Sequence, residues 1–305
     1  MKKQFIPFMF VLALLISACS NETTSEEQNE APQDTTETIT YESENGPIEV
    51  PADPQRVVVL SSYAGNVMAL NVNLVGVDPW AKMNPKFDDH LHDVEEVTDE
   101  SLEKIIELDP DLIIGLSNIN NVDKLNEIAP TVTYTYGAVD YLTQHLEIGK
   151  LLNKEDEAQA WIDDFKQRAQ AAGEEIKAEI GEDATVSVIE SFDKQFYVYG
   201  DNWGRGTEIL YQEMGLNMPE RVKEEALEPG FYALSLEVLP EFAGDYVILS
   251  SDGSDSSFQE TDTFNNIPAV QNNNVFEVNL YEFYFNDPVT LDFQLDYFID
   301  SFLEN

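Results

Sequence analysis

The segment Asp53-Pro54-Gln55-Arg56-Val57-Val58-Val59-Leu60 decides how the chain begins to fold. Its last four residues form a short apolar run after turn-forming residues, as expected of a strand buried on both faces of a sheet. Similar runs occur at 74–77, 112–114 and 132–134, and helix-like stretches such as 101–108 and 122–128 lie between some of them. This alternation predicts an α/β lobe.

The composition changes after this lobe. Residues 141–180 are rich in Ala, Glu, Gln and Lys, with apolar residues at mostly helical spacings, which predicts one or two helices with a break near Asn153. Strand-like runs then resume at 186–189, 196–199, 246–249 and 275–278, before a final helix over 289–303. We therefore expect two α/β lobes, at residues 46–140 and 181–305, joined by a long connecting helix at 141–180.

A short internal repeat supports this division. Ser101-Leu102-Glu103 is followed by Asp111-Leu112-Ile113-Ile114, and Ser235-Leu236-Glu237 is followed at the same offset by Asp245-Tyr246-Val247-Ile248. Ser-Leu-Glu before an apolar periodic run also predicts a helix start, so capping alone is an alternative for each copy. Recurrence before a buried strand in both halves favours two copies of one unit.

The first residues predict export. Lys2 and Lys3 precede an apolar run with the length of a secretory signal rather than a membrane span. The run ends at Ile16-Ser17-Ala18-Cys19, which resembles the lipobox of lipoprotein precursors, and Cys19 is the only cysteine in the chain. We expect residues 1–18 to be a signal peptide and Cys19 to be lipidated; an ordinary signal peptide with an incidental cysteine is the alternative.

The composition also limits the classes of function. Residues 19–45 hold almost nothing to bury, so we expect an acidic, disordered tether there. The formal net charge of −43 argues against nucleic acid as a partner. We find no nucleophile-elbow or phosphate-binding glycine motif, and no carboxylate spacing picks out an acid/base pair. A surface-anchored hydrolase remains the alternative from another class.

The order of these parts resembles the ferric-siderophore and cobalamin class of ABC-importer substrate-binding proteins, over nearly all of residues 46–305. Two segments are similar to the FhuD-type ferric hydroxamate (ferrichrome) binding lipoproteins of Gram-positive bacteria: Tyr199-Gly200-Asp201-Asn202-Trp203-Gly204-Arg205-Gly206 and Tyr284-Phe285-Asn286-Asp287-Pro288-Val289-Thr290-Leu291-Asp292-Phe293. The resemblance implies a class III periplasmic-binding-protein fold, with a rigid helix and a shallow ligand cleft between the lobes. It also implies a monomeric, cofactor-free binding protein, lipid-anchored on the extracellular face of the cell membrane.

The resemblance further implies where the ligand lies. The residues it places on the two walls of the cleft are Trp203, Arg205 and Tyr284 in the second lobe and Tyr136, Trp80 and Lys82 on or near the wall of the first. Family members often carry tryptophan where this chain has Tyr284, so the aromatic ring is kept but its contact area with the ligand is smaller. Glu103 and Glu237 are implied to dock on arginines of the two permease subunits, which work with an ATPase.

The same residues can be interpreted without the family. Trp203 and Arg205 lie in a Gly-rich turn after a predicted strand, where α/β folds display binding groups. Arg205 can donate hydrogen bonds to hydroxamate oxygens, and Trp203 offers flat apolar area. On the residues alone, core packing of Trp203 and a surface ion pair of Arg205 fit equally well.

Other candidate groups receive structural interpretations. The rings in Leu280-Tyr281-Glu282-Phe283-Tyr284-Phe285 are expected on a strand followed by a loop, mostly in the core, so only Tyr284 is assigned to the site. His90 and His92 suit a solvated loop better than a metal site, since a strand would direct the two rings to opposite faces. His145 is expected to be structural, and we expect the siderophore, not the protein, to hold the iron.

Charge helps to choose the ligand. A ferric tris-hydroxamate is nearly neutral, whereas ferric catecholates and citrates are anionic and need cations in the cleft. From residue 185 onward the bases are Lys194, Arg205, Arg221 and Lys223, of which only Arg205 lies in a segment similar to the family. A ferric hydroxamate is therefore favoured, and a catecholate, citrate, haem or cobalamin is the alternative.

Overall fold

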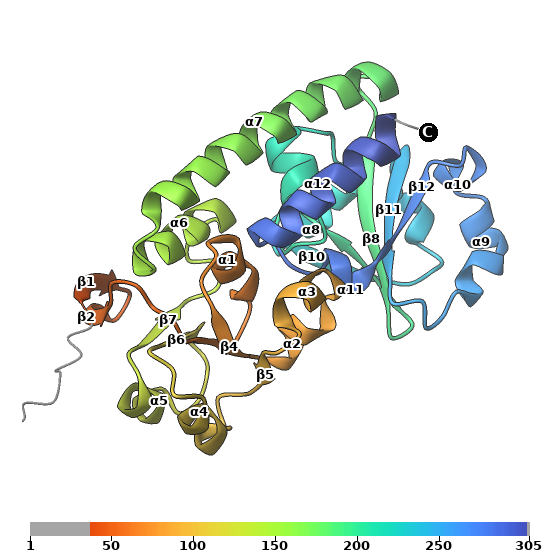
Figure 1. Cartoon of the computed structure of the whole chain (residues 1–305). Helices are drawn as coiled ribbons and strands as arrows, with labels where there is room; N and C mark the ends of the chain where they lie inside the picture. The colour runs from red at the N-terminus through yellow and green to blue at the C-terminus, as the bar shows by residue number, and fades with distance from the viewer. Residues whose placement is uncertain (1–36, 304–305) are drawn as a thin grey trace, which may run out of the picture. The chain divides into compact units, whose positions relative to one another are not determined.

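The computed structural model describes residues 37–303. Within this part of the chain, two five-stranded sheets each carry their own helices, and a two-stranded hairpin precedes the first sheet (Figure 1). The predicted α/β fold of two lobes joined by helices is confirmed. The expected signal peptide and Cys19 lie outside the described residues.

The first sheet has the strand order β5-β4-β3-β6-β7, with every neighbouring pair parallel. Its elements in chain order are β3 (Val57–Val59), α1 (Ala64–Ala69), β4 (Leu74–Val77), α2 (Pro79–Met83), a 3-10 turn (Pro85–Phe87), α3 (Asp88–Leu91), β5 (Glu95–Glu96), α4 (Leu102–Leu108), β6 (Leu112–Leu116), α5 (Val122–Ile128) and β7 (Thr131–Tyr134).

Both faces of this sheet are covered, which explains the continuous apolar runs. Val57 and Val59 belong to the core cluster that contains α1, whereas Val58 belongs to the cluster that contains side chains of α4 and α5. Because successive strand residues point to opposite faces, a strand buried on both faces needs apolar residues at every position.

The connection between the sheets is two helices, α6 (Tyr141–Leu151) and α7 (Glu155–Ile180). The break predicted near Asn153 is confirmed: Asn153 has φ of +56°, a left-handed conformation that asparagine tolerates and that ends a helix. In Figure 1, α7 runs alongside α12 over the second sheet.

The second sheet has the order β10-β9-β8-β11-β12, parallel across β8-β11-β12 and antiparallel across β10-β9-β8. Its elements are β8 (Val186–Phe192), β9 (Gln195–Tyr199), the π-helix η2 (Glu208–Glu213), α8 (Glu220–Ala226), β10 (Phe231–Leu234), a 3-10 turn (Leu239–Glu241), β11 (Tyr246–Ser251), a 3-10 turn (Ser257–Glu260), α9 (Asp262–Asn265), α10 (Pro268–Gln271), β12 (Val275–Asn279), α11 (Leu280–Phe283) and α12 (Pro288–Leu303).

Two expectations about secondary structure are wrong. The tether was expected to reach residue 45, but β1 (Thr38–Ser43) already pairs with β2 (Gly46–Pro51). This hairpin is held by Tyr41, which is buried in the first core with its hydroxyl 3.1 Å from that of Tyr134. The aromatic segment after β12 is the helix α11 rather than a strand, since the Asn279 side chain accepts from Tyr281 N and caps it.

The internal repeat has a common structural role. The Asp111 carboxylate accepts hydrogen bonds from the backbone N–H groups of Gln55 and Arg56, where the chain enters β3. The Asp245 carboxylate likewise accepts from the N–H and hydroxyl of Thr185, where the chain enters β8. In both lobes an aspartate at the start of one strand thus fixes the entry of its parallel neighbour.

A buried junction at the start of α12 joins the lobes. Asp287 precedes α12, and its carboxylate accepts from the N–H and hydroxyl of Thr290. A Cβ at Gly65 of α1 would lie 1.8 Å from Asp287 Oδ1, so only glycine permits this approach. Asn84 Nδ2 reaches Thr290 Oγ1 at 3.4 Å, and the rings of Phe87 and Phe285 stack 5.7 Å apart.

Asp287 makes stability depend on pH. Burial raises its pKa to about 6, against the hydrogen bonds from Thr290. The folded state therefore binds this proton more tightly than the unfolded state. The penalty for ionising Asp287, at most about 3 kcal/mol, is present above pH of about 6 and disappears as the pH falls to about 4.

The test is Asp287→Asn, which keeps a capping side chain but cannot ionise. Urea unfolding of both proteins between pH of about 4 and 7 should show the variant gaining stability relative to the wild type as the pH rises. Asp300→Asn, at an exposed position of α12, is the control. If the difference in unfolding free energy between Asp287→Asn and the wild type does not change with pH, the pKa of Asp287 is not raised by folding.

Candidate functional site

A cavity of about 910 Å³ lies between the two lobes. The first lobe contributes the segment after β3, the end of β6, the loop after β7 and the start of α6; the second contributes the loop after β9, η2 and the turn before α12. Four of the predicted ligand residues line it together: Tyr136, Trp203, Arg205 and Tyr284. The carboxyl ends of strands in a parallel sheet are the usual place for such a site.

The loop after β9 has an unusual backbone. Trp203, Gly204, Arg205 and Gly206 all have positive φ, at 87°, 77°, 62° and 80°. A Cβ at Gly204 would lie 2.3 Å from the Tyr284 carbonyl oxygen, and one at Gly206 would lie 2.5 Å from the Phe298 ring. Positive φ costs on the order of 1 kcal/mol or more at a tryptophan or an arginine, and such strain persists only where surrounding contacts impose it.

Trp203 faces the cavity rather than the core. Its side chain is 43% exposed, and its indole lies over Gly230, where a Cβ would be 2.3 Å from Nε1. Tyr136 from the first lobe approaches it with ring centroids 5.6 Å apart, and Phe231 meets it edge-on at 6.0 Å. The two exposed rings from different lobes therefore form one aromatic surface.

Arg205 is held in a buried ion pair. Its Nε donates to Glu190 Oε2 at 2.9 Å, and Nη1 donates to the Trp203 carbonyl oxygen at 2.9 Å. The Tyr199 hydroxyl donates to Glu190 Oε1 at 2.8 Å, so the carboxylate is held from two sides. Arg205 is neither a free cation nor a surface ion pair, since its charge is balanced by a carboxylate beneath the cavity wall.

Tyr284 connects the two lobes at the site. Its ring stacks on Trp80 at 5.1 Å and 17°, and the Arg205 guanidinium carbon lies 4.3 Å from the ring centroid. Trp80 is 47% exposed and is not among the residues that line the cavity, so its contact with the site is the stacking on Tyr284. Partial burial raises the pKa of Tyr136 to about 12, and the charge of Glu208 acts in the same direction.

The remaining predicted residues lie elsewhere. Lys82 Nζ donates to the Leu91 carbonyl oxygen at 2.7 Å and does not line the cavity. Glu103 is exposed in the first turn of α4, and Glu237 is exposed in the turn after β10. The Ser235 hydroxyl hydrogen-bonds to Glu237 and lowers the pKa of that carboxyl. Ser101 makes no side-chain cap with α4, so capping does not account for that copy of the repeat.

Several lining residues were not predicted from the sequence. They are Tyr63 and Asn66 near the start of α1, Gln144 on α6, Glu208 on η2, and Asn286. The Tyr63 hydroxyl and Gln144 Nε2 are buried without a hydrogen-bond partner. His145 lies behind this wall with Nδ1 3.3 Å from Asn66 Nδ2, and burial lowers its pKa to about 4, which fits the structural role expected of it.

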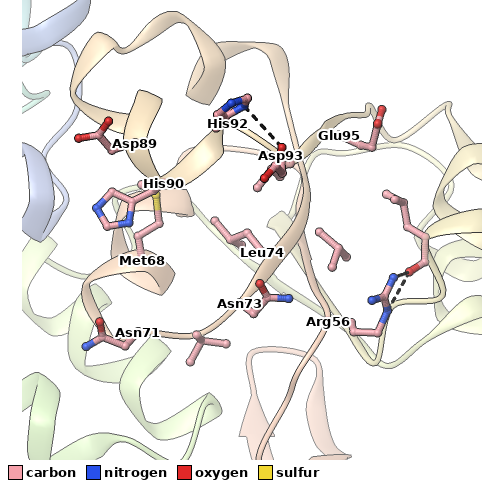
Figure 2. Close-up of a pocket in the computed structure, with 14 residues that line it drawn as sticks. Arg56, Met68, Asn71, Asn73, Leu74, Asp89, His90, His92, Asp93 and Glu95 are labelled. Carbon is pink, nitrogen blue, oxygen red and sulfur yellow. Dashed lines mark hydrogen bonds and ion pairs between the residues drawn. The ribbon is translucent and has the colours of Figure 1, made fainter.

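A second cavity, of about 670 Å³, lies on the first lobe (Figure 2). His90 and His92 line it, but they belong to the helical turn α3 and its end rather than to the solvated loop expected from the sequence. Within residues 37–303, no group of three or more His, Cys, Asp or Glu side chains is placed to hold a metal ion. No helix in the same range is long and apolar enough to cross a membrane.

Comparison with known proteins gives a consistent result. A family model described as "Periplasmic binding protein" matches residues 57–280. The iron(3+)-hydroxamate-binding protein FhuD of Bacillus subtilis is 36% identical over 96% of this chain and 95% of its own, and YxeB of the same species is 33% identical over 100% and 98%.

Solved structures agree. The FhuD protein of S. pseudintermedius matches with a TM-score of 0.79 and 35% identity, covering 88% of this chain and 99% of that one. FhuD2 of Staphylococcus aureus with bound ferrioxamine B matches with a TM-score of 0.78 and 34% identity, covering 82% and 99%. The chain therefore belongs to the periplasmic binding protein family and is of the FhuD type.

Proposed function

We propose that this protein binds ferric hydroxamate siderophores in the cavity between its lobes and delivers them to an ABC importer. The observation that supports this proposal most strongly is the aromatic wall of the cavity, which Tyr136, Trp203 and Tyr284 form around Arg205. The charge of Arg205 is balanced by Glu190. Relatives with this fold are named as binding proteins, which argues for binding rather than for the hydrolase considered from the sequence.

The electrostatics favour a chelate without negative charge. Arg205 is the only Lys or Arg among the residues that line the cavity, and its ion pair with Glu190 leaves no net positive charge there. A ferric catecholate would bring several negative charges into this site without compensation. A ferric tris-hydroxamate instead offers neutral oxygens to the remaining N–H groups of Arg205 and apolar chain to the aromatic rings.

Delivery and anchoring complete the proposal. A lipid on Cys19 would hold the protein at the outer face of the cell membrane, with the residues after it as a tether. Glu103 and Glu237 are exposed, one on each lobe, where carboxylates can meet arginines of two permease subunits. The protein would act as a monomer, since one copy supplies both walls of the cavity.

The first prediction concerns ligand class. Trp203 lines the cavity and Trp80 stacks on Tyr284 at 5.1 Å, whereas Trp161 is stacked on Phe165 at 4.9 Å, so a bound chelate should quench Trp203 most and Trp80 less. Titration of tryptophan fluorescence should show saturable quenching by a ferric hydroxamate and little by a ferric catecholate. Trp203→Phe should reduce the amplitude. Tight catecholate binding with no hydroxamate binding would contradict the proposal.

The second prediction separates the two roles of Arg205. Arg205→Ala should weaken hydroxamate binding by roughly 1.5–3 kcal/mol, and it should also lower stability by about 3–5 kcal/mol because Glu190 is left buried and unpaired. The pair Arg205→Gln/Glu190→Gln removes both charges and should recover most of that stability. The affinity of this double variant for the hydroxamate should stay low. If the double variant binds the hydroxamate as tightly as the wild type does, Arg205 has only a structural role.

The third prediction concerns docking. Glu103→Gln/Glu237→Gln should bind siderophore normally and unfold at nearly the same urea concentration as the wild type, because both carboxylates are exposed. It should stimulate the ATPase of the reconstituted importer poorly, because the paired carboxylates that set orientation are gone. Glu127→Gln/Glu260→Gln, at exposed positions elsewhere, is the matched control. Equal stimulation by the two double variants would move the docking surface away from Glu103 and Glu237.

A further inference from the structure

The hairpin formed by β1 and β2 is attached to β7, the strand that leads into the first-lobe wall of the cavity. The Asn45 amide donates to Thr133 Oγ1 at 3.1 Å, and the hydroxyls of Tyr41 and Tyr134 lie 3.1 Å apart. β7 is an edge strand of the first sheet, and it ends shortly before Tyr136. The hairpin therefore contacts the sheet directly beside the ligand site.

Glu44, in the turn of this hairpin, binds the residue that precedes Tyr136. Its carboxylate accepts from the Thr135 backbone N–H, with Oε1 at 3.0 Å and Oε2 at 3.1 Å, and from the Thr135 hydroxyl at 2.7 Å. The Ser117 hydroxyl lies 3.1 Å from the same hydroxyl of Thr135. A carboxylate that accepts from two donors of one residue fixes both the position and the direction of that residue.

Core packing does not fix the segment that carries Tyr136, since residues 135–140 are all exposed. The Ala138 N–H donates to the Thr135 carbonyl oxygen at 3.0 Å, and Gly137 has φ of +75°. These features are those of a β-turn with Tyr136 at its second position and glycine at its third. The segment then enters α6, so the turn is held at Thr135 on one side and at α6 on the other.

The placement of Tyr136 matters because its ring is part of the aromatic wall. The side chain is 44% exposed, lines the cavity and lies 5.6 Å from the Trp203 ring of the other lobe. An exposed ring on an exposed turn has few contacts of its own to hold it. If the turn were free, binding would have to order it, and that ordering would lower the affinity. Fixing the turn before the ligand enters therefore favours binding.

We propose that Glu44 is a positioning residue of the ligand site, which acts through Thr135 on the turn that presents Tyr136. This inference rests on the proposed function and adds the hairpin to the parts of the chain that determine affinity. Glu44 is not among the residues that line the cavity, so its effect on the ligand must pass through the turn. The family model, which matches residues 57–280, does not include the hairpin.

The test measures the dissociation constant of ferrioxamine B by titration calorimetry. Glu44→Ala should weaken binding about fivefold, because the ligand must then order the turn. Glu44→Gln keeps an acceptor for the Thr135 N–H and should stay within about twofold of the wild type. Glu42→Ala removes the same charge from an exposed position of the same hairpin and should bind like the wild type. Thr135→Val removes only the hydroxyl donor and serves as a second variant, with a loss of about threefold, should Glu44→Ala fail to fold.

A double-variant cycle tests whether Glu44 acts through Tyr136. Tyr136→Ala removes the ring and should weaken binding about tenfold. Adding Glu44→Ala to Tyr136→Ala should change the dissociation constant by less than about twofold, since no ring is left to position. A purely structural role of Glu44 would instead lower the affinity by the same factor whether or not the Tyr136 ring is present.

Unchanged affinity in folded Glu44→Ala would overturn the inference while leaving hydroxamate binding intact. Equal factors for Glu44→Ala with and without the Tyr136 ring would overturn it as well. Equal weakening by Glu42→Ala and Glu44→Ala would attribute the effect to the charge of the hairpin and also overturn it. Failure of the wild type to bind either ferrioxamine B or ferrichrome would instead overturn the proposed function.

Discussion

The ion pair between Arg205 and Glu190 is the constraint on which the ligand site depends. Burying the Glu190 carboxylate in a central strand is tolerated because Arg205 and the Tyr199 hydroxyl both donate to it. Arg205 pairs with Glu190 from a loop in which four successive residues, 203–206, have positive φ. The strained loop then presents Trp203 to the cavity, so the pair that neutralises the cavity wall also shapes it.

The same loop depends on the junction between the lobes. The backbone N–H of Arg205 donates to the Phe283 carbonyl oxygen at 2.7 Å. The next residue, Tyr284, contacts both Arg205 and Trp80. Close contacts such as that between Gly65 and Asp287 leave no space for α1 to move past α12. Packed cores change between discrete arrangements rather than deforming continuously, which favours small changes on binding over wide domain closure.

The sequence predicted those strands whose burial requires a recognisable pattern of apolar residues. Strands covered on both faces, such as β3 and β11, give continuous apolar runs, whereas the edge strand β10 is exposed at three of its four residues and gave no such signal. Lys82 was assigned to the wall of the first lobe from the resemblance to the family, but its amine donates to a local carbonyl, that of Leu91. Glu190 did leave a signal that was not used: a charge inside an apolar strand requires a partner.

Charge acts at two ranges in this protein. The net charge of −43 produces a field that attracts cations from a distance, but salt of about 0.15 M screens exposed charges beyond about 8 Å. Groups whose positions are fixed act at shorter range, and the Glu208 carboxylate is fixed in the cavity lining by three hydrogen-bond donors. Because Glu208 also accepts from Gly204, the group that adds negative charge to the cavity helps to hold the loop that carries Trp203 and Arg205. Shape and electrostatics at this site consequently cannot be varied independently, and a change of ligand charge would require changes in both.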